Sequence, residues 1–214
     1  MHLRTQVAAT IGLAAIVWIG TLFLMGEPLS WRMLTPFGAT VTVVSTASVI
    51  FVQFAWRWPI FRRWLVQRPN LAGTWRCDLT STYVGSDGKP VQKTVYVVIC
   101  QTLISLSFRL YSERAKSASI ADNLAKDGTD LFALAIAYQN IPRLEDRGSE
   151  SEIHFGSSLF THIDYDCQRI EGHYWTDRKS KGSLILLDRR LEQVATFEEA
   201  QKLFASPAIK SDLS

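Results

Sequence analysis

The chain has 214 residues, with 23 Lys and Arg, 20 Asp and Glu, and a formal net charge of +3; this length suits one or two structural units. The basic excess lies in the first third, because residues 1–69 hold six basic residues and one acid, whereas residues 70–214 hold 17 basic residues and 19 acids. The larger part of the chain is therefore not basic, and we expect no DNA or RNA partner.

Two uncharged apolar stretches come first in the chain, at residues 5–24 (TQVAATIGLAAIVWIGTLFL) and 37–56 (FGATVTVVSTASVIFVQFAW). A helix of twenty residues is about 30 Å long, which matches the hydrocarbon core of a bilayer. The pattern predicts a two-helix transmembrane hairpin over residues 1–56, with membrane lipid as a partner. A cleaved signal peptide is the alternative for the first stretch, but a second stretch follows at once and no small-residue cleavage site separates them.

Arginines flank the two stretches on one side. Arg4 precedes the first, and residues 57–70, a basic juxtamembrane linker, hold four more after the second. Because positive flanks stay in the cytoplasm, both termini are expected to be cytoplasmic. The second stretch is rich in small and hydroxyl residues, including Gly38, Thr42 and Thr46. These residues either pack the two helices together or also drive association between hairpins.

The period of the apolar residues changes after residue 70. Val, Ile, Thr, Tyr and Phe alternate with polar residues, and turn signals such as GSDGKP and KDGT separate the runs. Eight strands are predicted, at residues 73–83, 91–101, 103–111, 115–124, 130–138, 151–161, 168–176 and 182–190. Their spacing indicates an all-β antiparallel eight-stranded barrel or a sandwich over residues 71–192. A barrel of this size either holds one small ligand or is filled by side chains.

Residues 193–214 are predicted to form a short C-terminal helix and a tail, with Thr196 and Glu199 as a capping box at the start of the helix.

The three cysteines, Cys77, Cys100 and Cys167, are odd in number and not closely paired, which does not fit a disulfide framework and fits a reducing compartment. The densest group of possible metal ligands is a short run: His162, Asp164, Asp166, Cys167 and His173. Its spacing matches no zinc pattern. We therefore expect no catalytic residue, no metal site and no cofactor, and we predict that the chain is not an enzyme.

The order of these features resembles one family. A two-span hairpin is followed by RPNLAGTW, and then by a β-rich domain that contains YQNIP, HFG and GHYWTDRKSKGSLIL. The chain resembles the membrane effectors of CBASS anti-phage systems, in the family with two transmembrane helices and a β-strand-rich domain, over roughly residues 5–190. The resemblance implies a lipocalin-like barrel that senses a cyclic oligonucleotide, with a cyclic dinucleotide as first choice, made by a partner nucleotidyltransferase.

The resemblance also implies the consequences of ligand binding. The effector forms a homo-oligomer in the bacterial inner membrane, where it is a multi-pass protein. The membrane loses its integrity, and the infected cell dies by abortive infection before the phage matures.

A cyclic dinucleotide needs aromatic faces for its bases and positive or hydrogen-bonding groups for its two phosphates. Six residues at neighbouring strand ends are predicted to supply these: Tyr138, Asn140, His154, Tyr174, Thr176 and Arg178. The two tyrosines are stacking platforms and Asn140 is suited to a base edge. Thr176 and Arg178 are suited to a phosphate and are expected to share one face of a strand.

Plainer interpretations stay open at these positions. The tyrosines and His154 also fit an ordinary core, and Arg178 also fits a solvated turn. Lys179 and Lys181 are assigned to the hairpin surface. Two other functions remain possible: a membrane-tethered carrier of an apolar ligand, with at most one or two charges in its pocket, and an interaction scaffold without an internal cavity.

Overall fold

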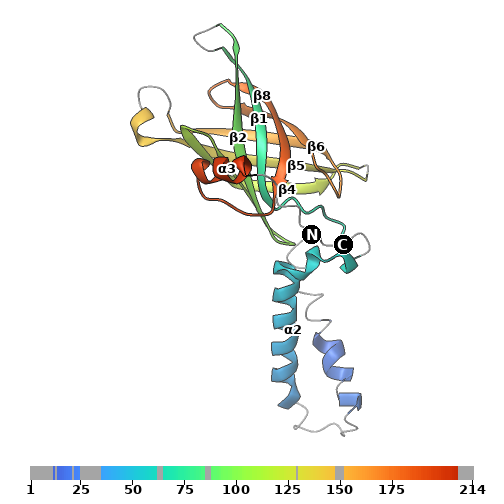
Figure 1. Cartoon of the computed structure of the whole chain (residues 1–214). Coiled ribbons are helices and arrows are strands. Elements are labelled where there is room, and N and C mark those ends of the chain that lie inside the picture. Colours follow the sequence, from blue (N-terminus) through green and yellow to red (C-terminus); the bar gives the residue numbers. More distant parts are fainter. Residues whose placement is uncertain are drawn as a thin grey trace. The chain divides into compact units, whose positions relative to one another are not determined.

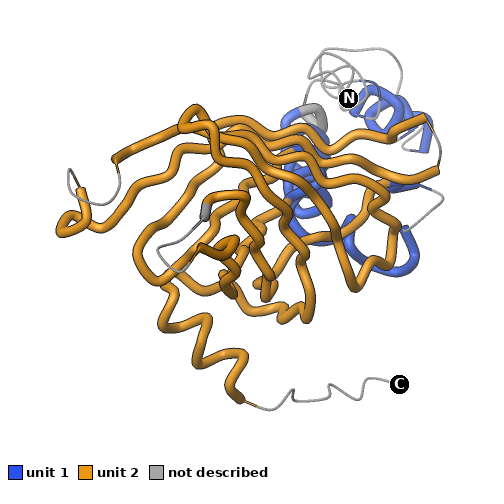
Figure 2. Tube along the Cα trace, turned by 90° about the horizontal axis from the view of Figure 1, so that it is seen from above, with its two compact units in different colours: residues 1–67, 102–104 blue, residues 68–101, 105–214 orange. Residues whose placement is uncertain are grey.

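The computed structural model describes residues 12, 14–20, 22–24, 35–61, 65–84, 88–128, 130–147 and 152–206. The chain divides into two compact units, shown in different colours in Figure 2. The first comprises Met1–Gln67 and Thr102–Ile104, and the second comprises Arg68–Gln101 and Ser105–Ser214. Each unit is described by itself.

The first unit contains helix α2 (Thr35–Gln53) and two short 3-10 helices, η2 (Ala55–Arg57) and η3 (Pro59–Phe61). A hydrogen bond from the Phe54 amide to the Ile50 carbonyl, 2.9 Å, marks the last turn of α2. The side chain of Trp56 is buried, and the Arg57 guanidinium lies 5.5 Å from the centre of its ring.

The predicted transmembrane hairpin is wrong on this structure. None of the helices in the described ranges is long and apolar enough to cross a membrane. Much of the first predicted span, at residues 5–24, lies outside the described residues. The second was predicted from its length and its uncharged, apolar composition, but α2 carries six Ser and Thr residues and ends at Gln53, before the predicted limit at residue 56. The hairpin part of the fold class and the two-span inner-membrane localisation, with both termini cytoplasmic, are corrected accordingly.

The second unit is an antiparallel barrel of eight strands, in which each strand pairs with the next and β8 returns to β1. Figure 1 shows β2, β1 and β8 side by side in its wall. The strands are β1 (Gly73–Val84), β2 (Pro90–Gln101), β3 (Leu106–Tyr111), β4 (Ala115–Lys126), β5 (Phe132–Pro142), β6 (His154–Ile163), β7 (Ile170–Thr176) and β8 (Lys181–Arg190). The eight predicted strands are all present, and the barrel is closed.

Side chains alternate between the inside and the outside of the wall, as the period of a strand requires. On β5 the side chains of Phe132, Leu134, Ile136 and Tyr138 are buried, at every second position. The same alternation on the other strands places one apolar core inside the barrel. This core leaves space near one end, and the up-and-down topology gathers the turns after β1, β3, β5 and β7 at that end.

The opposite end is closed around Trp75, which is fully buried. The indole N–H of Trp75 donates to the Leu71 carbonyl at 2.9 Å, and the Arg189 guanidinium lies 5.5 Å from its ring centre. Arg189 also donates to the carbonyls of Ala72 and Asn70, each at 2.8 Å. One tryptophan and one arginine therefore fasten the segment that leads into β1 to the end of β8.

Helix α3 (Phe197–Ala205) packs on the outer face of β2 (Figure 1). The rings of Phe197 and Phe204 lie 5.3 and 5.5 Å from that of Tyr96, between ring centres. The hydroxyl of Thr196 caps the helix by accepting from the Glu199 amide, 3.1 Å. The Glu199 carboxylate reaches back to the amide of residue 195, one position before the cap.

Candidate functional site

A cavity of about 420 Å³ opens at the end of the barrel where the turns after β1, β3, β5 and β7 meet. Residues from all eight strands line it, and the buried side chains of Phe108 and Leu184 belong to its inner part. The volume lies within the range of about 300–1,000 Å³ that is usual for small-molecule sites. The barrel is therefore not completely filled by its own side chains.

All six residues predicted to bind a ligand line this one cavity: Tyr138, Asn140, His154, Tyr174, Thr176 and Arg178. Asn140 lies opposite His154 in the pairing of β5 with β6. The Asn140 amide donates to the Ser117 hydroxyl on β4 at 2.8 Å, which fixes the orientation of its amide group. The structure brings the six residues together, and their roles in binding stay a prediction.

The two cavity tyrosines each lie over a glycine of the neighbouring strand. Tyr138 pairs with Gly156, and Tyr174 pairs with Gly182. A Cβ atom on Gly156 would lie 2.5 Å from Cζ of Tyr138, and one on Gly182 would lie 2.7 Å from Cε1 of Tyr174. The missing side chains thus let both rings lie along the barrel wall, an arrangement suited to stacking a base.

Substituting alanine for Gly156 is expected to displace the Tyr138 ring, because the new Cβ would also meet the Trp175 carbonyl at 2.9 Å. Overpacking of this kind costs about 1–3 kcal/mol of stability. Affinity for the cavity's ligand should fall as well, as measured by titration calorimetry alongside thermal unfolding.

Gly172→Ala is the matched control for this substitution. Its Cβ would meet the Phe160 ring at 2.5 Å in the core, away from the cavity lining. It should cost similar stability and leave affinity unchanged. Equal affinity losses in the two variants would show that the Tyr138 ring does not act in binding.

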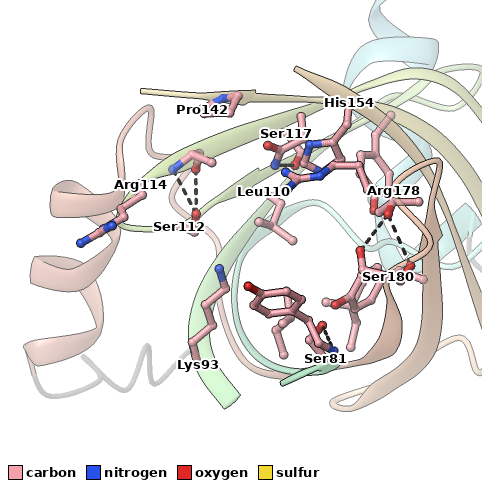
Figure 3. A pocket seen from close by; sticks show the side chains of 18 of the residues that line it. Ser81, Lys93, Leu110, Ser112, Arg114, Ser117, Pro142, His154, Arg178 and Ser180 are labelled. Atoms are coloured by element: carbon pink, nitrogen blue, oxygen red, sulfur yellow. Dashed lines mark hydrogen bonds between the residues drawn. The ribbon is translucent and has the colours of Figure 1, made fainter. Parts of the chain in front are cut away.

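Basic side chains surround the mouth of the cavity. Lys93, Arg114 and Arg178 line it together with one acid, Asp146. Figure 3 shows Lys93 across the cavity from Arg178, whereas Arg114 points away from the other lining side chains. Lys93 is exposed overall, but partial desolvation lowers the pKa of its ammonium group, and Glu113 acts in the opposite direction. The mouth is suited to anionic groups.

The turn that carries Arg178 is fastened to β6. The Asp177 amide donates to the Phe155 carbonyl, and the Phe155 amide donates to the Asp177 carboxylate, both at 3.0 Å. The hydroxyls of Thr176 and Ser180 lie 2.7 Å apart across the same turn. Strand β7 ends at Thr176, so Arg178 reaches the cavity from a turn and not from the strand face that the sequence predicted.

The inner part of the cavity combines apolar side chains with neutral hydroxyl groups. Burial raises the pKa of Tyr138 to about 12, with further raising from Tyr174 and Asp177, and the nearby Ser158 hydroxyl acts in the opposite direction. The Tyr138 phenol is therefore neutral at physiological pH and remains a hydrogen-bond donor. Charged groups lie at the mouth of the cavity and neutral hydroxyls lie deeper.

Among the lining residues that were not selected from the sequence are three polar ones inside the strands: Lys93, Ser117 and Ser158. The signal was available, because Lys93 precedes Val95 and Val97 on the inward face of β2 at every second position. Ser158 lies four positions after His154 on β6, and therefore on the same face of the strand. Extending the alternation along each strand, instead of looking for motifs at strand ends, would have found them.

Residues 66–188, more than half of the chain, match the family model described as "Cap15, cyclic dinucleotide receptor domain". The chain belongs to this family. It is also 28% identical over 148 residues to the CD-NTase-associated protein 15 of Staphylococcus schleiferi, an alignment that covers 69% of this chain and 75% of the relative. The resemblance to CBASS effectors is thereby confirmed at the level of the family, and a cyclic oligonucleotide is the ligand class that it supports.

Proposed function

We propose that the barrel is the sensor of a CBASS effector and binds a cyclic dinucleotide in the cavity at its open end. The observation that best supports this proposal is that the segment matching the family model, residues 66–188, contains almost the whole barrel together with this cavity. The two bases stack on the rings of Tyr138 and Tyr174. Lys93 and Arg178, on different sides of the mouth, bind the phosphates.

The expected contacts are sufficient for tight binding. Stacking contributes about 1–3 kcal/mol per base, and each hydrogen bond to a charged group contributes about 1.5–3 kcal/mol. Nanomolar affinity requires about 12 kcal/mol in total. Two stacks, two phosphate contacts and the amide of Asn140 approach this value.

The composition of the cavity favours this function over the alternatives. A carrier of apolar ligands was expected to have at most two charges in its pocket, but this cavity is lined by Lys93, Asp146 and Arg178 even when the outward-pointing Arg114 is left aside. A scaffold was expected to have no internal cavity. Both alternatives therefore fit the barrel less well than a receptor for a small anion does.

The proposal includes the events after binding. The protein acts as a receptor and not as an enzyme, and its ligand comes from a partner nucleotidyltransferase. Ligand binding favours a homo-oligomer over the monomer, since only a difference in affinity between two states shifts their populations. The oligomer then disrupts the membrane of the infected cell and causes abortive infection. This part is supported by the family resemblance.

The test is a calorimetric titration of the full chain with a panel of cyclic di- and trinucleotides and with a fatty acid. We expect one cyclic dinucleotide to bind with sub-micromolar affinity. Arg178→Ala should weaken that binding by about tenfold or more, whereas Lys179→Ala, one residue further along the same turn, should not. Binding of the fatty acid alone by folded protein would refute the proposed function.

A further inference from the structure

One buried hydroxyl of the cavity has no partner. Ser158 lines the cavity from the inward face of β6, and its residue is only 2% exposed. Within the described part of the chain its Oγ makes no hydrogen bond. It lies near enough to the Tyr138 phenol to lower the pKa of that group, against the larger raising effect of burial.

An unpaired buried hydroxyl costs stability, because it loses its hydrogen bonds to water on folding and regains none. Natural proteins pair almost all such groups, and an exception at a binding site indicates a partner that arrives with the ligand. Ser158 is placed for this role. Its register partners are Ile136 on β5 and Tyr174 on β7, so it lies between an apolar side chain and a proposed stacking platform.

The surroundings of Ser158 indicate which part of the ligand this residue contacts. A phosphate beside Ser158 would be desolvated with neutral hydroxyls as its partners, whereas Lys93 and Arg178 are at the mouth. A base edge is neutral and carries both donors and acceptors. A serine hydroxyl donates and accepts, and the neutral Tyr138 phenol beside it does the same.

We propose that Ser158 and the phenol of Tyr138 form a neutral subsite that binds the hydrogen-bonding edge of one base and so determines which cyclic dinucleotide is preferred. This inference rests on the proposed function and deepens it. The phosphates bind at the mouth, and one base points inward, where its edge forms a hydrogen bond with the Ser158 hydroxyl.

The experiment measures stability and affinity of the full chain with Ser158→Ala, using the cyclic dinucleotide that binds the wild type best. Removing an unpaired hydroxyl should leave the melting temperature unchanged or raise it. Affinity should fall about tenfold, which corresponds to about 1.4 kcal/mol. Loss of a purely structural serine would not lower the affinity without also lowering the melting temperature. Ser157→Ala, the adjacent outward-facing serine, should change neither.

Ligand analogues identify the group that Ser158 contacts. An analogue lacking one exocyclic group of a base should bind the wild type about tenfold more weakly and should lose little more in Ser158→Ala. The 2′-deoxy analogue should lose the same factor in both proteins. Unchanged affinity in Ser158→Ala, or coupling to the 2′-hydroxyl instead of the base, would overturn the inference and leave the proposed function standing. If no cyclic dinucleotide bound the wild type, the proposed function itself would fail, and this inference with it.

Discussion

Replacing both Tyr138 and Tyr174 with alanine is expected to lower the affinity for the cyclic dinucleotide by about 30-fold to 10⁴-fold. Each ring that stacks on a base contributes about 1–3 kcal/mol, and every 1.4 kcal/mol is a factor of ten. The rings lie on opposing glycines, so the neighbouring strands hold both platforms in place before the ligand arrives. The measurement is titration calorimetry with the double variant and each single variant.

Phenylalanine at position 174 separates stacking from hydrogen bonding. Tyr174→Phe keeps a stacking face and should bind within about threefold of the wild type. Tyr165→Ala is the matched control for lost stability, because that ring packs on Phe132, outside the cavity lining. If the double alanine variant remained folded and bound as well as Tyr165→Ala does, the bases would not stack on Tyr138 and Tyr174.

The barrel was predictable because its signal is local and repeated. Each strand carries its own period-two pattern, and the turns between strands are marked by Gly, Asp and Lys. Tyr138, Asn140 and His154 were selected for their positions near strand ends, and all three line the cavity. Closure of the barrel depends on the pairing of β1 with β8, which are over a hundred residues apart in the chain. No local sequence pattern predicts that pairing.

The site was harder to predict than the fold. Arg178 was assigned by strand alternation, but it reaches the cavity because Asp177 fastens the turn to β6. That hydrogen bond joins two elements and has no counterpart in the sequence around Arg178. The glycines under the tyrosines were likewise visible only after the register was known, because Gly156 and Tyr138 meet across strands.

The transmembrane prediction was wrong for a different reason. Two apolar stretches of twenty residues without charge were taken as sufficient, although Thr40, Thr42 and Ser45 within the second stretch lower its mean hydropathy. Length and the absence of charge are necessary for a membrane span but not sufficient, and none of the helices in the described ranges is long and apolar enough to cross a membrane.

Trp75→Ala is expected to be the most destabilising single substitution in the barrel. The side chain is fully buried, and truncating a buried tryptophan costs about 3–5 kcal/mol. The change also removes the donor to the Leu71 carbonyl and the ring beneath the Arg189 guanidinium. For a chain of this size the melting temperature should fall by about 6–20 °C, as measured by calorimetry or circular dichroism.

The position of Trp75 makes this prediction specific. It lies at the closed end of the barrel, away from the cavity, so the variant should bind the ligand within about twofold of the wild type wherever it is still folded. Trp175→Ala is the matched control, because Trp175 is on the outer wall and 49% exposed; its loss should shift the melting temperature by a few degrees at most. If Trp75→Ala were no more destabilising than Trp175→Ala, the closed end would be held by contacts other than the tryptophan and Arg189. The barrel would then be stabilised chiefly by its closed ladder of strand pairs.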